Sequence, residues 1–287
     1  MENRLFIPGS EWVYFKIYTG TKTADSILKN ELFEFVYEML NNEIIDKWFF
    51  IRYSDPDFHI RLRLHLSLPD FTQIFTHFHE TFLPLVDSGS IWNIQCDTYK
   101  RELERYGKEL IEEAESFFFI DSECIIQIIK ILEGSENHRW MIALKLIDEL
   151  LSDFGLNLEE KQKFMETTGK SFKTEFGFNE HNSKQFNSKF RDNKKTVESV
   201  LRDVIQDKDF LQLMQPIKKR SKQLKTIIEK IKTKAGKEKS INELLQSYLH
   251  MMLNRLFRSK NRQHELLLYD FMYRYYTSEI AKRKYNK

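Results

Sequence analysis

The chain has 287 residues, which is enough to bury a sizeable core in one large domain or in two closely packed ones. Charged residues make up 31% of it and no run of about 18 apolar residues occurs, so a membrane-spanning helix is excluded. The net charge of +2 is too small by itself to imply a polyanionic partner, and the N-terminus lacks a signal-peptide profile, so we expect a cytoplasmic protein.

The first predicted elements are a strand and a helix. Glu11 to Tyr18 is rich in aromatic and β-branched residues, which is typical of a strand, and a turn signal follows at residues 19–21. Asp25 to Asn42 is predicted to be helical, because apolar residues recur in it at intervals of three and four.

Trp48 to Leu66 consists of two alternating apolar runs joined by a Ser-Asp-Pro-Asp turn, and this pattern predicts a β-hairpin. Side chains alternate between the two faces of a strand, so one face of the second arm is apolar and the other is cationic or titratable. The apolar residues are Ile60, Leu62, Leu64 and Leu66, and the polar ones are His59, Arg61, Arg63 and His65. The polar face is either the solvated side of an ordinary strand or one wall of a functional site.

Phe71 to Leu85 is predicted to form a helix that packs on the apolar face of the hairpin, with Phe71, Ile74, Phe75, Phe78 and Phe82 buried. Its two histidines, His77 and His79, point in different directions on a helix, which argues against a shared metal ion. The two cysteines, Cys96 and Cys124, lie far apart without CxxC spacing. We therefore expect free thiols and no metal site.

An extended segment, Ser90 to Arg101, is followed by a polar cluster that runs to Gly107, and helical patterns begin there. The expected helices are Lys108 to Phe119, Ser122 to Leu132, His138 to Asp153 and, from an Asn cap, Asn157 to Thr167. Gly169 to Asn193 is polar and is interpreted as a long surface connection or a mobile lid. The remainder, Lys194 to Arg283, is predicted to be rich in helix, with a break at Ala235 and Gly236.

Basic residues are concentrated between Pro216 and Gln263, where they far outnumber the acidic Glu229, Glu238 and Glu243. Such a surplus can attract nucleic acid or an acidic peptide. A solvated helix surface is the favoured interpretation, because no aromatic residues for stacking are interleaved with the lysines between positions 218 and 239.

Ser240 and Glu243 have the spacing of a capping box, which predicts the start of a helix at this point. On that helix a polar stripe shares one face, because its members are three or four residues apart: Ser247, His250, Asn254 and Arg258. His250 is either a histidine satisfied by hydrogen bonds in a helix interface or a general acid or base.

Four sequence blocks together resemble one family. In chain order they are WVYFKIY, WFFIRYSDPDFHIRLRL, DTYKRELERYG and SYLHMMLNRLF, and the resemblance extends from about Glu11 to Tyr276. They are similar to the C-terminal domain of lantibiotic dehydratases, which is also called the thiopeptide-type bacteriocin biosynthesis domain. The resemblance implies a single α+β domain over residues 1–287, in which a small antiparallel sheet, about 1–106, packs with a helix-rich part, about 107–287.

The resemblance also implies a reaction. In the full-length family, Ser and Thr residues of a precursor peptide receive glutamate from glutamyl-tRNA, and this domain then eliminates glutamate to leave dehydroalanine or dehydrobutyrine. Arg61 and Arg101 match arginines that would hold the glutamyl carboxylates, and His250 matches the histidine that would move the proton. Residues expected to orient the substrate are His59, Arg63, Tyr99, Arg105 and Asn254. No metal or organic cofactor is implied.

The expected partners are a precursor peptide, with its leader and its Ser/Thr-containing core, and a separate tRNA-dependent glutamylating protein, because the chain looks like a free-standing member. A homodimer is left open. Two alternatives remain: an aza-[4+2] cycloaddition that forms a pyridine in thiopeptide biosynthesis, or a non-catalytic role in binding the precursor.

Overall fold

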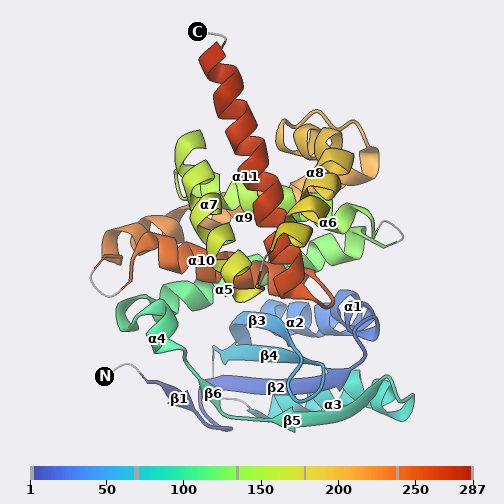
Figure 1. Ribbon diagram of the computed structural model, residues 1–287. Coiled ribbons are helices and arrows are strands. Elements are labelled where there is room, and N and C mark those ends of the chain that lie inside the picture. Colours follow the sequence, from blue (N-terminus) through green and yellow to red (C-terminus); the bar gives the residue numbers. More distant parts are fainter. Residues whose placement is uncertain (1–2, 68–70, 134–135, 178, 237–238, 286–287) are drawn as a thin grey trace.

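A computed structural model describes residues 3–67, 71–133, 136–177, 179–236 and 239–285. A small sheet forms one end of the molecule, and long helices cover and extend from it (Figure 1). The strands are β1 (Leu5–Phe6), β2 (Trp12–Thr19), β3 (Ile45–Tyr53), β4 (His59–Leu66), β5 (Ile91–Cys96) and β6 (Tyr99–Lys100). Short helices α1 (Thr23–Lys29), α2 (Glu31–Asn41) and α4 (Leu103–Tyr106), and the longer α3 (Phe71–Asp87), lie among the strands in the sequence.

The rest of the described chain is helical, which confirms the predicted α+β fold with a helix-rich C-terminal half. The helices are α5 (Ile111–Ile131), α6 (His138–Asp153), α7 (Leu158–Glu175), α8 (Glu180–Leu201), α9 (Lys208–Lys234), α10 (Ile241–Leu256) and α11 (Asn261–Tyr285). None of the helices in the described residues is both long and apolar enough to cross a membrane.

The main sheet has the strand order β3-β4-β2-β5, and each strand is antiparallel to its neighbours. The predicted hairpin is confirmed, and its apolar face is buried, with Leu62 aligned between Phe50 and Phe15. Phe15 stacks on Phe78 of α3 with 3.9 Å between ring centroids. Phe75 was expected in the core but remains 42% exposed, because only its edge contacts Phe15. Phe71 is half-buried.

The free edge of β3 is closed by side chains from the helices. The backbone N–H of Phe50 donates to the Ser122 hydroxyl at 3.3 Å, and the Phe50 carbonyl accepts from Arg255 Nε at 2.8 Å. One step along, the N–H of Arg52 donates to Asn254 Oδ1 at 3.1 Å. An open sheet edge would leave such groups available for pairing with another strand. Here they join the sheet to α5 and α10.

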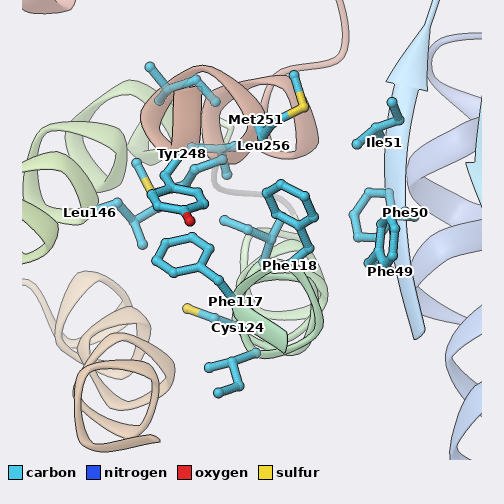
Figure 2. Packing of buried hydrophobic residues seen from close by; sticks show 14 of the residues in the cluster. Phe49, Phe50, Ile51, Phe117, Phe118, Cys124, Leu146, Tyr248, Met251 and Leu256 are labelled. Carbon is cyan, nitrogen blue, oxygen red and sulfur yellow. The ribbon is translucent and has the colours of Figure 1, made fainter. Parts of the chain in front are cut away.

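An aromatic core fills the space behind this edge. Phe118 of α5 lies between Phe49 of β3 and Tyr248 of α10, with ring centroids 5.4 and 6.1 Å away (Figure 2). Phe117 stacks on Tyr248 at 4.2 Å. The sheet, α5 and α10 therefore share one aromatic core, which positions α10 relative to the hairpin.

Two helix boundaries differ from the predictions. The helix expected from Asp25 to Asn42 is divided at Asn30, whose backbone angles (φ −109°, ψ −92°) are not helical. The two helices expected on either side of residues 120 and 121 form one continuous α5. The break expected at residues 120 and 121, before a helix start at Ser122, is absent: Asp121 and Ser122 are fully buried, and Asp121 accepts from Arg220 and Arg255.

The polar segment Gly169 to Asn193 is not a long connection or a lid, so that prediction was wrong. Its residues belong to the end of α7 and the first half of α8, separated by a turn in which Gly177 has φ +58°. Asn179 caps α8, and the phenylalanines Phe186 and Phe190 lie one turn apart and pack against the core. The predicted caps at Asn157 and Ser240 are confirmed, as is the break at Ala235 and Gly236.

Candidate functional site

His250 lies where two cavities meet. One, of about 360 Å³, is bordered by α4, α7, α10 and α11, and we call it the α7 cavity; Arg105, Phe172 and Gln246 are among its lining residues. The other, of about 460 Å³, lies between the end of the hairpin, α10 and the start of α11, and we call it the hairpin cavity. Its lining includes Tyr53 and Asn254, and His250 contributes to the walls of both.

The imidazole of His250 is held by a buried carboxylate. Its Nδ1 lies 2.8 Å from Oε1 of Glu265 on α11, and the side chains are 21% and 1% exposed. A carboxylate can only accept, so this contact is satisfied when Nδ1 carries the proton, which leaves Nε2 free to accept another. Tyr269 and Arg262 border the same carboxylate, each at 3.5 Å. A histidine fixed in this way can serve as a base, and the carboxylate would stabilise its charged form.

Arg61 has no carboxylate within 4.0 Å among the residues that the structure describes, although it is partly buried on the polar face of β4. Its guanidinium lies over the ring of Tyr53, 3.4 Å from the centroid, and its Nε donates to Nε2 of His59 at 3.1 Å. Tyr53 also lines the hairpin cavity. The guanidinium is thus oriented by an aromatic face and an imidazole, and its charge is available to an anion.

His59 is the residue that orients Arg61. It is 1% exposed, and its Nδ1 lies 2.8 Å from the carbonyl of Asp57, so Nδ1 donates there while Nε2 accepts from Arg61. Burial, with the charge of Arg61 nearby, lowers the pKa of His59. The structure therefore gives His59 a supporting place behind Arg61.

Arg63 is buried beneath aromatic rings. Its guanidinium lies 4.6 to 5.2 Å from the ring centroids of Tyr14, Phe49 and Tyr99. Its Nε has no hydrogen-bond partner within the described part of the chain. Arg63 faces a narrow space of about 20 Å³ that it shares with Arg255, which is room for about one water molecule. The polar face of the hairpin is therefore not a solvated strand surface.

Arg101 occupies a different environment from Arg61. Its Nε and Nη2 donate to the two carboxylate oxygens of Glu115 on α5, at 2.7 and 2.6 Å, and Tyr99 donates to the same group at 2.9 Å. Arg101 and Glu115 are both buried. The bidentate grip that the sequence suggested for a substrate carboxylate is thus made with an internal partner.

Arg105 and Asn254 are placed near His250 but have partners of their own. Arg105 lines the α7 cavity with His250 and donates to Glu102 at 3.2 Å. Asn254 lines the hairpin cavity while its Oδ1 accepts from the backbone of β3. The polar stripe is confirmed on α10 for Ser247, His250 and Asn254, which line the two cavities. Arg258 also borders the hairpin cavity, but it follows the end of the helix at Leu256.

The structure thus brings His250 and Asn254 together in the wall of the hairpin cavity. Arg61 is not a lining residue of that cavity and reaches its wall only through the contact with Tyr53, and Arg101 lies in a separate buried ion pair. Sequence reasoning missed Glu265. No pattern within the chain links this residue to His250, because the two lie on different helices whose approach depends on the turn between α10 and α11.

Comparisons with known proteins agree with this architecture. The family described as lantibiotic biosynthesis dehydratase C-term matches residues 12–276. The subtilin biosynthesis protein SpaB of Bacillus subtilis is 26% identical over 179 residues, which is 61% of this chain. The epidermin biosynthesis protein EpiB of Staphylococcus epidermidis is 24% identical over 98% of this chain. The matched regions span only 17% and 27% of those two proteins.

Solved structures share the fold. The tRNA-dependent lantibiotic dehydratase MibB from Microbispora superposes with a TM-score of 0.75 at 18% identity, covering 97% of this chain and 29% of that one. The pyridine synthase TbtD from thiomuracin biosynthesis superposes with a TM-score of 0.61 at 10% identity, covering 94% and 99%. With the sequence profile matched from Trp12 to Tyr276, the chain belongs to the lantibiotic biosynthesis dehydratase C-terminal family.

Proposed function

We propose that this chain eliminates glutamate from glutamylated Ser or Thr residues of a precursor peptide. A base takes the α-proton, the electron pair forms the Cα=Cβ bond, and the Cβ–O bond breaks, so that glutamate leaves as a carboxylate. The products are dehydroalanine or dehydrobutyrine and free glutamate. The ester is supplied by a tRNA-dependent glutamylating protein.

The observation that carries the proposal is the contact of His250 with Glu265 at the meeting point of two cavities. In the proposed reaction Nε2 of His250 accepts the α-proton, and Glu265 stabilises the imidazolium that forms. An imidazole is a weak base toward a carbon acid, so the charge that develops on the neighbouring amide carbonyl must also be stabilised.

Arg61 is the cation best suited to bind the negatively charged substrate. No carboxylate of the described residues lies within ion-pair distance of its guanidinium, which is held in place by Tyr53 and His59. Its role is to hold a glutamyl carboxylate. Arg63 has a weaker claim to direct contact, since the space beside it has room for about one water molecule and not for a glutamyl group. It supports the positive potential of this sheet face.

Arg101 acts as a positioning residue in this proposal. Its ion pair with Glu115 fixes Tyr99, whose ring lies 5.0 Å from the guanidinium of Arg63. Loss of Arg101 would leave Glu115 buried without its cation and disturb that face of the sheet. Arg105 and Asn254, on either side of His250, are the side chains that orient the peptide.

The deciding experiment uses the purified chain and a synthetic peptide that carries one glutamylated Ser. Mass spectrometry should show loss of glutamate and formation of dehydroalanine, and the His250→Ala variant should leave the ester intact. Retained binding without any elimination by the wild-type protein would contradict the proposal and favour a role in escorting the precursor.

A second candidate function is pyridine formation by aza-[4+2] cycloaddition, which the extent of the match to the pyridine synthase favours. Such an enzyme would act on a peptide that already contains two dehydroalanines. The protein is incubated with that peptide, and mass spectrometry is used to look for loss of water and of the leader peptide. Such a loss would distinguish pyridine formation from elimination. The buried Glu265 behind His250 fits proton abstraction, and for this reason elimination is ranked first.

A further inference from the structure

The hairpin cavity has a cationic lining. Its charged wall residues are Arg52, Arg258, Lys260 and Arg262, with His250 at one side and no Asp or Glu among the described residues that line it. The volume of about 460 Å³ is within the range of sites that bind small ligands or a peptide side chain with its neighbours. The lining therefore favours an anionic occupant.

Arg52, one of the lining residues, is a buried guanidinium with incomplete hydrogen bonding among the described residues. It is 2% exposed at the end of β3, its Nε donates to the carbonyl of Arg255 at 2.9 Å, and its Nη2 donates to Asp25 at 2.5 Å. Its Nη1 is buried and has no partner within the described chain. Buried donors in native proteins are nearly always paired, so the charge of this guanidinium is only partly satisfied by its neighbours.

The carboxylates behind the cavity do not balance its cations. Asp25 is shared by Arg52, Arg139 and Arg258, and among the described residues Glu136 is the one further acid in ion-pair contact with the last two. Three guanidinium groups thus share two carboxylates. Lys260 at the rim is exposed and has no carboxylate within 4.0 Å in the parts of the chain described. Arg262 is paired with Glu175 and also contacts Glu265, so the positive excess at the cavity comes from Lys260 and from the arginines that share Asp25 and Glu136.

The first turn of α11 adds to this potential. Asn261, Arg262 and Gln263 line the cavity and begin a helix of 25 residues, whose N-terminal end carries a partial positive charge. Tyr53, Phe58 and Phe176 line the same cavity and give it apolar surface. The combination suits an acidic side chain carried on a peptide better than it suits a free inorganic ion.

We propose that the hairpin cavity binds an acidic side chain of the peptide substrate, close to the residue that His250 acts on. This inference rests on the proposed function for the nature of the substrate. It assigns the exposed Lys260 to a peptide carboxylate, with the charge of Arg52 behind it, and it predicts that the enzyme prefers sites with Asp or Glu nearby.

The test compares two fluorescent peptides of one sequence around an unmodified Ser, with Asp on both sides of the Ser in one and Asn in the other. Anisotropy should show that the acidic peptide binds more tightly, and that Lys260→Gln weakens it about tenfold, as expected for one charge-assisted hydrogen bond. The neutral peptide should be unaffected by Lys260→Gln. Lys225→Gln, an exposed lysine of α9 outside the cavity, is the matched control.

Equal affinity for the two peptides, or equal loss of both on Lys260→Gln, would overturn the inference. Displacement of the acidic peptide by transfer RNA but not by free L-glutamate would overturn it in favour of a phosphate site. The elimination assay separates the two claims: elimination with no preference for acidic peptides removes this inference alone, and selective binding without elimination removes the proposed function alone.

Discussion

The Nδ1 atom of His250 and the carboxylate of Glu265 are 2.8 Å apart, and this contact joins α10 to α11 at the centre of the candidate site. Glu265 has 1% of its side chain exposed, while His250 reaches two cavities. The pair combines a fixed carboxylate with an accessible imidazole, which is the arrangement that a general base requires.

The first prediction concerns this pair. Glu265→Gln should lower kcat for elimination about 10- to 100-fold, because the imidazole loses the carboxylate that orients it and stabilises its charge. KM should change little. The rate is measured by mass spectrometry on the glutamylated peptide, with thermal unfolding as a check on the fold.

A double variant shows whether Glu265 acts through His250. In a His250→Ala background, Glu265→Gln should cause no further loss, since residues that act as a unit are not additive. An additional drop in the double variant would mean that Glu265 has a separate function.

The second prediction concerns Arg61. Arg61→Ala should slow elimination about a hundredfold and let the glutamylated peptide accumulate, because a charge-stabilising donor is lost. Arg61→Lys should recover part of the rate, since it restores the charge without the planar, bidentate geometry. Arg191→Ala, an exposed arginine of α8, serves as the control and should behave like the wild type. Normal elimination by Arg61→Ala would remove this residue from the site.

The third prediction is about stability. Asp25→Asn should destabilise the protein by about 3–5 kcal/mol, because buried guanidinium groups of Arg52 and Arg139 would lose the carboxylate they share. Urea unfolding measures this difference. Asp192→Asn on the exposed surface of α8 should change the free energy of unfolding by less than about 0.5 kcal/mol.

The ion pairs of Asp25 also predict how the stability of the protein depends on pH. Burial opposes ionisation of Asp25, but the attraction of Arg52, Arg139 and Arg258 outweighs it and holds the pKa below the ordinary value of 3.8. A carboxyl group whose pKa is lowered on folding contributes stability above the unfolded pKa and loses it as the pH falls through the folded pKa. The advantage of the wild type over Asp25→Asn should therefore be constant above about pH 5 and shrink below about pH 4. A constant difference down to pH 2 would contradict this.

Local patterns in the sequence were sufficient for much of the fold. The alternation from Ile60 to Leu66 places four side chains on a buried face, and the helix His138–Asp153 has the bounds that its apolar periodicity predicts. Ser240 acts as the predicted cap. Each of these depends on neighbours within a few residues, so the signal is present in the chain itself.

Features that depend on distant partners could not be read in this way. Asp121 and Ser122 resemble a helix start, yet Asp121 is buried mid-helix because Arg220 and Arg255 arrive from α9 and α10. Both arginines fall in the basic stretch from Pro216 to Gln263, for which a solvated helix surface was the favoured interpretation, yet both are fully buried. In the same way, the polar stripe marked His250 as a candidate, but the partner that defines its chemistry comes from another helix.

The last prediction separates two roles for Arg101. Arg101→Met should weaken elimination whether this residue contacts substrate or only fixes its surroundings, because Glu115 is left buried and unpaired. The double variant Arg101→Met, Glu115→Leu removes both charges and should be more stable than either single variant, since an apolar pair of similar size avoids the uncompensated charge.

If Arg101 is a positioning residue, the double variant should also recover part of the elimination rate. If its guanidinium touches the substrate, the double variant should be as stable as expected but no more active than Arg101→Met. Urea unfolding gives the stability of each variant, and mass spectrometry of the peptide gives its elimination rate. The positioning role requires that both values are higher in the double variant than in Arg101→Met.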